Sequence, residues 1–162
     1  SLPAAPAETP PARAQASGLP VPRFVSLKAD EVNLRAGPGR DYPTSWVYKR
    51  AGLPLEVVKE YDIWREVRDS EGTQGWVIQS LLSGRRTALV QPWDVKAGTA
   101  TATATLRKKS SQSAAPVATL EAGVIANVIS CDKEWCRVSV DKYTGYIEQK
   151  KLWGVYEGEE VK

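Results

Sequence analysis

The sequence predicts an all-β protein built from two small β-barrels in tandem. Short runs of β-branched and aromatic residues, broken by charged or glycine-containing turns, fill residues 53–78 and again residues 123–147. This texture is typical of successive β-hairpins, and helical periodicity is almost absent. The two stretches also align when Trp64 is placed on Trp135, which indicates an internal repeat.

The repeat keeps its register over most of its length. With the two tryptophans aligned, "AGLPLEVV" falls on "AGVIANVI" and "WREV" falls on "WCRV" without a gap. Upstream, "NLRAGPG" meets "TLRKKSS", and downstream "GWVIQSLL" meets "GYIEQKKL", each after a one-residue length difference. Four matched segments in one order predict two copies of a single folding unit.

Three regions follow from the repeat. Residues 1–22 are mostly alanine and proline, so we expect a disordered tail that cannot bury enough apolar surface to fold. We expect residues 23–89 to form the first unit and residues 90–162 the second. Trp93, near the junction, suggests a packed join between the units, although a place in the core of the second unit explains it equally well.

Composition and charge restrict the partners and the location. Hydrophobic residues make up 42% of the sequence and charged residues 25%, as is typical of folded, water-soluble proteins. The formal net charge is only +3 and the densest basic cluster, residues 106–111, is short, so we expect no nucleic-acid partner. No apolar run reaches the roughly 18 residues of a membrane span. Because the sequence contains no methionine, we expect a removed signal peptide and a periplasmic or secreted protein.

The lack of histidine argues against catalysis. Without histidine, Cys–His and Ser–His nucleophilic pairs are excluded, as is any zinc site with a histidine ligand. The spacing of the acidic residues marks no facing carboxylate pair of the kind that glycoside hydrolysis needs. We therefore expect a protein that is not an enzyme and uses no cofactor and no metal.

The matched segments resemble a known family, the bacterial SH3-like domain, a small β-barrel found in tandem in exported and cell-envelope proteins. The resemblance rests on "VNLRAGPG", "AGLPLEVV", "DIWREV" and "GTQGWV", in this order, and on their counterparts in the second repeat. It implies two tandem SH3-like β-barrels that act as a binding module, with cell-wall glycan or peptide or an envelope protein as the partner. The alternative is a structural spacer or assembly domain with no small ligand of its own.

Four glycines in these segments have predicted backbone roles. Gly37 and Gly39, on either side of Pro38, are expected to supply positive φ angles where a long loop leaves a strand. Gly75 and Gly145 each precede an aromatic residue that enters a strand, where we expect a bulge or a close approach between backbones.

The strand pattern also predicts which side chains point outward. Arg35 and Arg107 alternate with leucines, so they point away from the core, and we expect each to tie a loop through hydrogen bonds. Trp64 and Val67 are three residues apart and so lie on opposite faces of their strand. If Val67 is buried, Trp64 faces outward or is half covered, and the same reasoning applies to Trp135 in the second repeat.

The tryptophans are the strongest candidates for a ligand site. In eukaryotic SH3 domains the tryptophan at this point of the strand forms the ligand platform, so the resemblance implies Trp64 and Trp135 as platforms. The alternative is that both rings cover the barrel surface or the other repeat. The complete candidate patch of the first repeat consists of Arg35, Asp41, Tyr42, Trp46, Tyr48, Tyr61 and Trp64. Aromatic rings beside polar groups suit glycans or short peptides, while some of these rings are expected to fill the core instead.

The proline and tyrosine that complete the eukaryotic groove are missing. Their places are taken by Ile78 and Leu81 in the first repeat and by Glu148 and Lys151 in the second. Recognition of a polyproline ligand is therefore not expected.

Cys131 and Cys136 raise three alternatives: a metal site, a redox centre or a structural disulfide. Two cysteines do not complete a tetrahedral metal site, and a redox pair more often has two intervening residues at the start of a helix. The repeat alignment places the cysteines at the positions of Glu60 and Arg65, on either side of a hairpin turn, where antiparallel strands are close enough for a disulfide. We expect a structural disulfide and an oxidising compartment, with a thiol–disulfide enzyme as the alternative.

Overall fold

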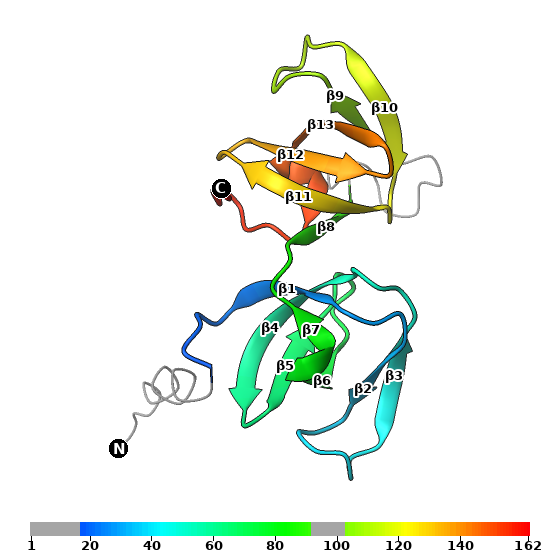
Figure 1. The fold of residues 1–162 in the computed structure, drawn as a ribbon, viewed down its shortest axis with the longest axis vertical. Coiled ribbons are helices and arrows are strands. Elements are labelled where there is room, and N and C mark those ends of the chain that lie inside the picture. Colours follow the sequence, from blue (N-terminus) through cyan, green and yellow to red (C-terminus); the bar gives the residue numbers. More distant parts are fainter. Residues whose placement is uncertain (1–16, 92–102) are drawn as a thin grey trace. The chain divides into compact units, whose positions relative to one another are not determined.

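The structure, a computed structural model, describes residues 17–91 and 103–162. The chain divides into two compact units, Ser1–Gly84 and Arg85–Lys162, and each unit contains one seven-stranded antiparallel sheet (Figure 1). The described residues contain β-strands and short 3₁₀ turns but no α-helix. The predicted fold class, two tandem SH3-like β-barrels, is confirmed.

The first unit runs from β1 to β7 and its sheet has the order β3-β2-β6-β5-β4-β1-β7. Its elements are β1 (Arg23–Leu27), β2 (Val32–Arg35), β3 (Thr44–Tyr48), β4 (Pro54–Tyr61), β5 (Trp64–Arg68), β6 (Gln74–Ile78), the 3₁₀ turn η2 (Gln79–Leu81) and β7 (Leu82–Ser83). The fully buried side chains of this sheet, among them Leu34, Leu55 and Val67, come from alternating strand positions and form one core.

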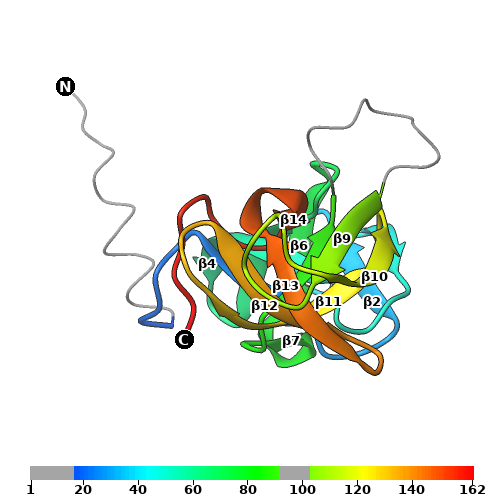
Figure 2. The same ribbon diagram turned by 90° about the horizontal axis from the view of Figure 1, so that it is seen from above.

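The second unit repeats this layout strand for strand, with the order β10-β9-β13-β12-β11-β8-β14. Its elements are β8 (Thr87–Val90), β9 (Thr103–Arg107), β10 (Pro116–Glu121), β11 (Ile125–Cys131), β12 (Trp135–Val140), β13 (Tyr143–Glu148), the 3₁₀ turn η3 (Gln149–Lys151) and β14 (Leu152–Trp153). Figure 2 shows β11, β12 and β13 side by side, as their pairing requires. Leu106, Val138 and Ile147 are buried in the core of this unit.

The division between the units lies between Gly84 and Arg85, earlier than the boundary after residue 89 that the sequence suggested. The reason is β8, which pairs with β11 of the second unit as β1 pairs with β4 of the first. Ala88 and Val90 are accordingly buried in the second core. The expectation for Trp93 lies outside the described residues.

Residues 17–22, which we expected to belong to a disordered tail, lie against the first unit. The Ser17 hydroxyl donates a hydrogen bond of 2.6 Å to Glu60, and the Arg23 guanidinium binds the same carboxylate at 2.7 Å. The expectation for residues 1–16 concerns a part of the chain that lies outside the described residues.

The glycine predictions had different outcomes. At Gly75 a Cβ atom would lie 2.9 Å from the Arg35 carbonyl oxygen, and at Gly145 it would lie 2.7 Å from the Arg107 carbonyl oxygen, so the predicted close approach between backbones is confirmed. The prediction of positive φ for Gly37 and Gly39 is wrong. A side chain is excluded at Gly37 for another reason, because its Cβ would lie 2.4 Å from an atom of the Tyr42 ring.

Candidate ligand-binding site

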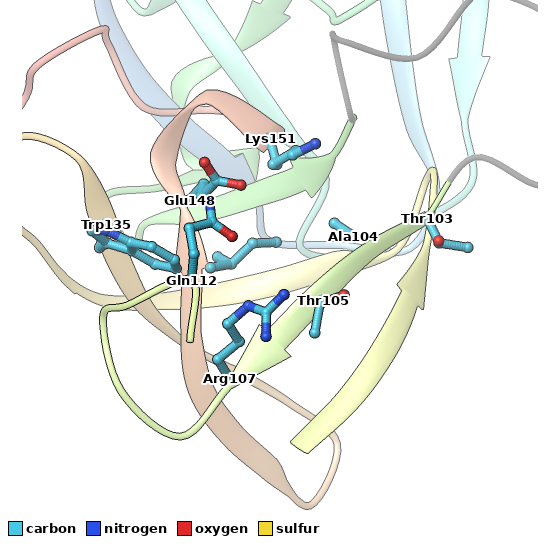
Figure 3. Close-up of a pocket in the computed structure, with 9 residues that line it drawn as sticks. Thr103, Ala104, Thr105, Arg107, Gln112, Trp135, Glu148 and Lys151 are labelled. Atoms are coloured by element: carbon cyan, nitrogen blue, oxygen red, sulfur yellow. The ribbon is translucent and has the colours of Figure 1, made fainter. Parts of the chain in front are cut away.

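A pocket of about 200 Å³ opens on the second unit beside Trp135 (Figure 3). We call it the Trp135 pocket. It is lined by Thr103, Ala104, Thr105, Arg107, Gln112, Trp135, Ile147, Glu148 and Lys151. These residues come from strands β9, β12 and β13, from the loop after β9 and from η3. Elements distant in the sequence therefore supply an aromatic ring, hydroxyl groups and charges of both signs to one site.

Trp135 is held at the start of β12 by the hairpin turn before it. The Asp132 carboxylate accepts hydrogen bonds of 2.7 Å from the backbone N–H groups of Glu134 and Trp135, which is the local pattern by which aspartate stabilises turns. Val138 is fully buried, so Trp135, three residues earlier, points to the outer face. Its side chain is half-buried, as predicted, and lines the pocket.

Arg107 supports the pocket through its loop. Its guanidinium donates a hydrogen bond of 2.9 Å to the carbonyl of Ala114, at the far end of the loop that follows β9. In the first unit, Arg35 makes the same kind of bond to the carbonyl of Tyr42, at 3.0 Å. The predicted role of both arginines as loop ties is confirmed.

Glu148 and Lys151 bring charge to the pocket. Glu148 is the direct cross-strand neighbour of Trp135, so their side chains share the outer face of the sheet. Its carboxylate lies 3.6 Å from the ammonium group of Lys150, which is 67% exposed. Lys151 ends η3, and its backbone carbonyl accepts a hydrogen bond of 2.7 Å from Gln91.

The equivalent tryptophan of the first unit is closed off. Trp64 and Val67 lie on opposite faces of β5, as predicted. Trp64 is only 7% exposed, so the prediction that it is outward or half covered is wrong, and its burial agrees with the alternative that the ring covers the barrel. Its direct cross-strand neighbours are Tyr61 on β4 and Ile78 on β6, and Ile78 stands at the place where the second unit has Glu148. An apolar neighbour covers the ring better than a carboxylate does, because burying the carboxylate costs free energy.

Tyr48 also leaves the predicted patch, because it is buried in the first core. Its hydroxyl donates a hydrogen bond of 3.0 Å to Asp69. Burial raises the pKa of Tyr48, and the negative charge of Asp69 raises it further. The phenol therefore stays neutral and structural.

The other predicted residues of the first unit stay on its surface. Tyr42, Trp46 and Tyr61 are 46%, 56% and 61% exposed, Asp41 is exposed, and Arg35 is half-buried. Trp46 lies on β3 and Tyr61 on β4, and three strands separate β3 from β4 in the sheet. The predicted patch is thus divided between different parts of the unit.

Trp135 was predicted from the sequence, but most of the residues around it were not. Thr103, Thr105 and Gln112 were not predicted as site residues, and Glu148 and Lys151 were predicted only to replace the missing proline and tyrosine of the eukaryotic groove. A signal was present for the threonines, because they alternate with the buried residues Ala104 and Leu106 on one strand and so point to the outer face with Arg107.

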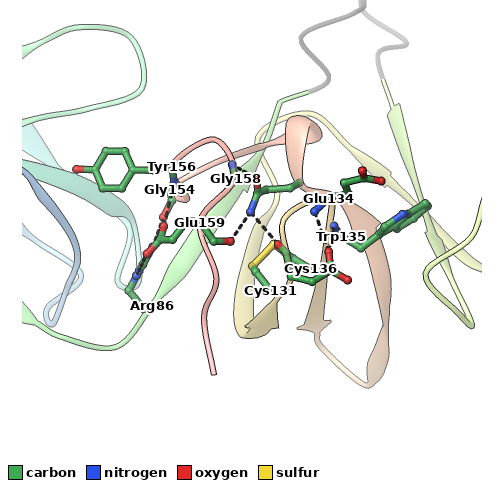
Figure 4. Close-up of a disulfide and its surroundings, with 11 residues drawn as sticks. Arg86, Cys131, Glu134, Trp135, Cys136, Gly154, Tyr156, Gly158 and Glu159 are labelled. Carbon is green, nitrogen blue, oxygen red and sulfur yellow. Dashed lines mark hydrogen bonds and ion pairs between the residues drawn. A yellow bond between two sulfur atoms is a disulfide. The ribbon is translucent and has the colours of Figure 1, made fainter.

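The predicted disulfide between Cys131 and Cys136 is confirmed, with the two Cα atoms 4.0 Å apart (Figure 4). The two cysteines are a directly facing pair on β11 and β12. Cys131 is 7% exposed and Cys136 is fully buried. Buried sulfur atoms are poorly placed for exchange with a substrate thiol, which disfavours the thiol–disulfide enzyme.

Residues 156–161, which we call the C-terminal strap, lie against this hairpin. Val161 exchanges two backbone hydrogen bonds with Cys131, at 2.8 and 3.0 Å. The buried side-chain amide of Gln149 joins the strap to the hairpin turn, because it donates to the carbonyls of Asp132 and Glu159 and accepts from the N–H of Gly158.

The strap also carries an ion pair. Both carboxylate oxygens of Glu159 accept hydrogen bonds of 2.9 Å from the Arg86 guanidinium (Figure 4). Burial alone would raise the pKa of Glu159, but the hydrogen bonds from Arg86 and from the backbone of Tyr156 outweigh it, and the pKa is lowered.

The described residues contain neither a cluster of metal-binding side chains nor a membrane-spanning helix. Across residues 17–91 and 103–162, no three side chains of His, Cys, Asp or Glu gather in a way that would hold a metal ion. Within the same ranges, no helix has the length and hydropathy that crossing a membrane requires.

The family model for the bacterial SH3 domain matches residues 28–84 and again residues 100–154. The chain therefore belongs to the bacterial SH3 domain family, and it contains two copies of the domain. Modules of this family are typically non-catalytic.

Among curated proteins, the chain is 25% identical over 126 residues to "Putative N-acetylmuramoyl-L-alanine amidase YrvJ" of Bacillus subtilis (strain 168). The match covers 76% of this chain but only 24% of that protein. Solved structures with 12% identity include NlpC2 from Trichomonas vaginalis, with a TM-score of 0.36, and an NlpC/P60 family protein from Bacillus cereus ATCC 10987, with a TM-score of 0.34. The match to NlpC2 covers 82% of this chain and 48% of the NlpC2 chain. The match to the Bacillus cereus protein covers 80% of this chain and 55% of that protein's chain.

Proposed function

We propose that this chain is a non-catalytic binding module of the bacterial cell envelope that recognises cell-wall material through the Trp135 pocket. The observation that carries the proposal is the half-buried Trp135 ring beside hydroxyl and charged groups in one concave site. The lining is mainly polar, and polar groups held at fixed positions in a concave site can orient a small ligand.

Two further observations support the envelope location. A structural disulfide persists in oxidising compartments such as the periplasm and the cell exterior. The curated relative carries the name of a putative N-acetylmuramoyl-L-alanine amidase, which is the name of a cell-wall enzyme. This chain spans about a quarter of that relative, so the relative's catalytic activity is not transferred to it.

The test is binding of the full chain to purified peptidoglycan sacculi, measured by co-sedimentation and by a change in tryptophan fluorescence. Trp135→Ala should weaken binding by about tenfold or more, as expected for a central aromatic contact. The matched control is Trp46→Ala, which removes an exposed tryptophan of the first unit and should change binding by less than about twofold. No muropeptides should be released from the sacculi.

Failure to bind sacculi would refute wall recognition. Loss of binding in the Trp46 variant with normal binding in the Trp135 variant would place the site on the first unit instead. The first unit exposes Tyr42 and Trp46, on β3 and the loop before it, and these rings favour the second candidate function, which is assembly with a protein partner.

A further inference from the structure

The C-terminal strap covers the end of the hairpin that carries the disulfide. Both cysteines belong to the apolar core of the second unit, and Val161 of the strap packs against this core. The backbone of Val161 also pairs with Cys131 at the edge of β11, beyond the stretch that pairs with β8. The strap therefore closes the part of the hairpin that β8 does not reach (Figure 4).

The strap has little buried surface of its own. None of its six residues is buried. Its pairing with Cys131 is an isolated bridge, and its charged anchor is the pair of Glu159 with Arg86, whose side chains are each 23% exposed. A segment with so little buried surface opens locally at a lower free energy than the strands of the core.

We infer that the C-terminal strap controls access to the disulfide, so that reduction requires the strap to open and in turn favours the open strap. The reductant is a dithiol. Its thiolate attacks the sulfur of Cys131, which is the less buried cysteine, and a mixed disulfide forms as the Cys136 thiolate leaves. The second thiol of the reductant then releases Cys131. The dithiol loses two electrons and becomes a disulfide, and the chain gains two electrons and two protons.

Gln149 connects the strap to the Trp135 pocket. Its side chain is 5% exposed, and it directly follows Glu148, which lines the pocket. Its amide group donates to the carbonyl of Asp132, whose carboxylate holds the backbone of Trp135. When the strap opens, Gln149 loses its two bonds to the strap, and the turn before Trp135 loses part of its support. Resting on the proposed function, opening of the strap therefore weakens ligand binding in the pocket.

The first test follows reduction of the folded full chain by excess dithiothreitol, with alkylation of the released thiols and mass spectrometry. Glu159→Gln removes the carboxylate that binds Arg86. It should speed reduction by about tenfold or more, because hydrogen bonds between charged groups are the strong ones. The matched control is Glu157→Gln, which removes an exposed carboxylate of the same strap and should change the rate by less than about twofold. Equal rates for the two variants would overturn the inference.

Urea separates opening of the strap from unfolding of the whole second unit. Opening of the strap exposes little surface, so the reduction rate should depend only weakly on urea at low concentration. Exchange of the β12 amides in the same samples reports unfolding of the unit and should depend on urea more steeply. If reduction showed the same steep dependence as these amides, only unfolding of the whole unit would expose the disulfide, and the strap would have no controlling role.

The second test concerns the pocket and uses a stronger change. Glu159→Arg places a second guanidinium group against Arg86, so the strap should be open in most molecules, and reduction should be faster still. Binding to purified sacculi should fall by about fivefold or more, while Glu157→Arg, with the same change in charge, should bind within about twofold of the unchanged chain. Protection of the β12 amides checks that the second unit remains folded.

The outcomes distinguish this inference from the function on which it rests. Faster reduction with normal sacculus binding in Glu159→Arg would overturn the link to the pocket. Reduction rates that do not respond to Glu159 would overturn control by the strap. If the unchanged chain does not bind sacculi, the proposed function fails, and the reduction rates still decide whether the strap controls the disulfide.

Discussion

The two units fold alike, but they stabilise the same hairpin in different ways. Glu60 and Arg65 face each other on β4 and β5, where Cys131 and Cys136 face each other on β11 and β12. The first pair forms an ion contact of 3.4 Å, and the second forms a covalent bond. The two units therefore link the strands at the same cross-strand position by different chemistry.

A second difference follows from the first. Arg23 and Arg86 occupy equivalent positions at the beginning of their units, and each binds a carboxylate. In the first unit the carboxylate is Glu60, from the hairpin itself. In the second unit a cysteine stands at that position, and the C-terminal strap supplies Glu159 instead. The arginine is common to both units, and only the source of its partner changes.

A third difference lies in the cores. Tyr48 and Asp69 form a hydrogen-bonded pair in the first unit. The repeat places Leu120 and Val140 at these positions, and both belong to the apolar core of the second unit. A polar pair has thus been exchanged as a whole for an apolar pair, which avoids the cost of leaving one buried polar group without a partner.

The largest effect is expected when the ion cluster of the first unit is broken. Glu60→Ala removes a carboxylate whose side chain is fully buried and leaves Arg23 and Arg65 without it. Breaking a buried pair costs about 3–5 kcal/mol, which is enough to unfold a small unit. Hydrogen exchange of β4 and β5 amides in the full chain measures the loss, while the second unit should keep its protection.

The control and the pH dependence make this prediction specific. Glu31→Gln removes an exposed ion pair with Lys49 and should cost less than about 1 kcal/mol.

Burial alone would raise the pKa of Glu60, but hydrogen bonds from Ser17 and Arg23 and the charge of Arg65 lower it below 4.5. Its stabilisation is therefore complete above pH 4.5 and is lost as the pH falls through the folded pKa. Glu60→Gln should reduce this acid sensitivity, and an unchanged acid profile would argue against the cluster.

Reduction should affect only the second unit. The chain has two cysteines, both in this disulfide, so reductant leaves the first unit without a target. Unfolding, reduction and refolding under reductant should lower the stability of the second unit by about 2 kcal/mol, because the closed loop is short. Exchange of the Val161 amide, which is bonded to Cys131, should become faster. Two free thiols in the unfolded, unreduced protein would contradict the disulfide.

The sequence predicted the features that depend on local pattern. The all-β class, the repeat and the alignment of Glu60 with Cys131 followed from alternation and from the order of short motifs. The face of Trp135 followed from its distance to Val138. These inferences need only the geometry of a strand, which every strand shares.

The features that were missed depend on distant contacts. Residues 87–89 were assigned to the first unit because only the pairing of β8 with β11 shows where they belong. Trp64 was expected to be outward or half covered because its burial depends on neighbours from other strands, such as Tyr61 and Ile78, which the spacing along its own strand does not reveal. The pair of Arg86 and Glu159 joins opposite ends of one unit, and no spacing along the sequence marks it.

The smallest expected effect concerns the polar pair of the first core. Tyr48→Phe removes one hydroxyl and leaves Asp69 holding the backbone N–H groups of Glu71 and Thr73 at 2.9 Å. Because the carboxylate keeps these partners, the loss at neutral pH should be about 1 kcal/mol by urea denaturation. Tyr61→Phe, at an exposed tyrosine, is the control and should change stability by less than about 0.5 kcal/mol.

The dependence of stability on alkaline pH tests whether burial keeps the Tyr48 phenol protonated in the folded unit. The folded pKa of Tyr48 is raised above its ordinary value of 10.0, so above that pH the unfolded chain loses a proton that the folded chain keeps. Stability then falls as the pH rises, and Tyr48→Phe should remove this part of the fall. Since Leu120 replaces the tyrosine in the second unit, the variant should make the alkaline response of the first unit more like that of the second. An unchanged alkaline slope would mean that Tyr48 ionises freely in the folded unit and that its bond to Asp69 contributes little.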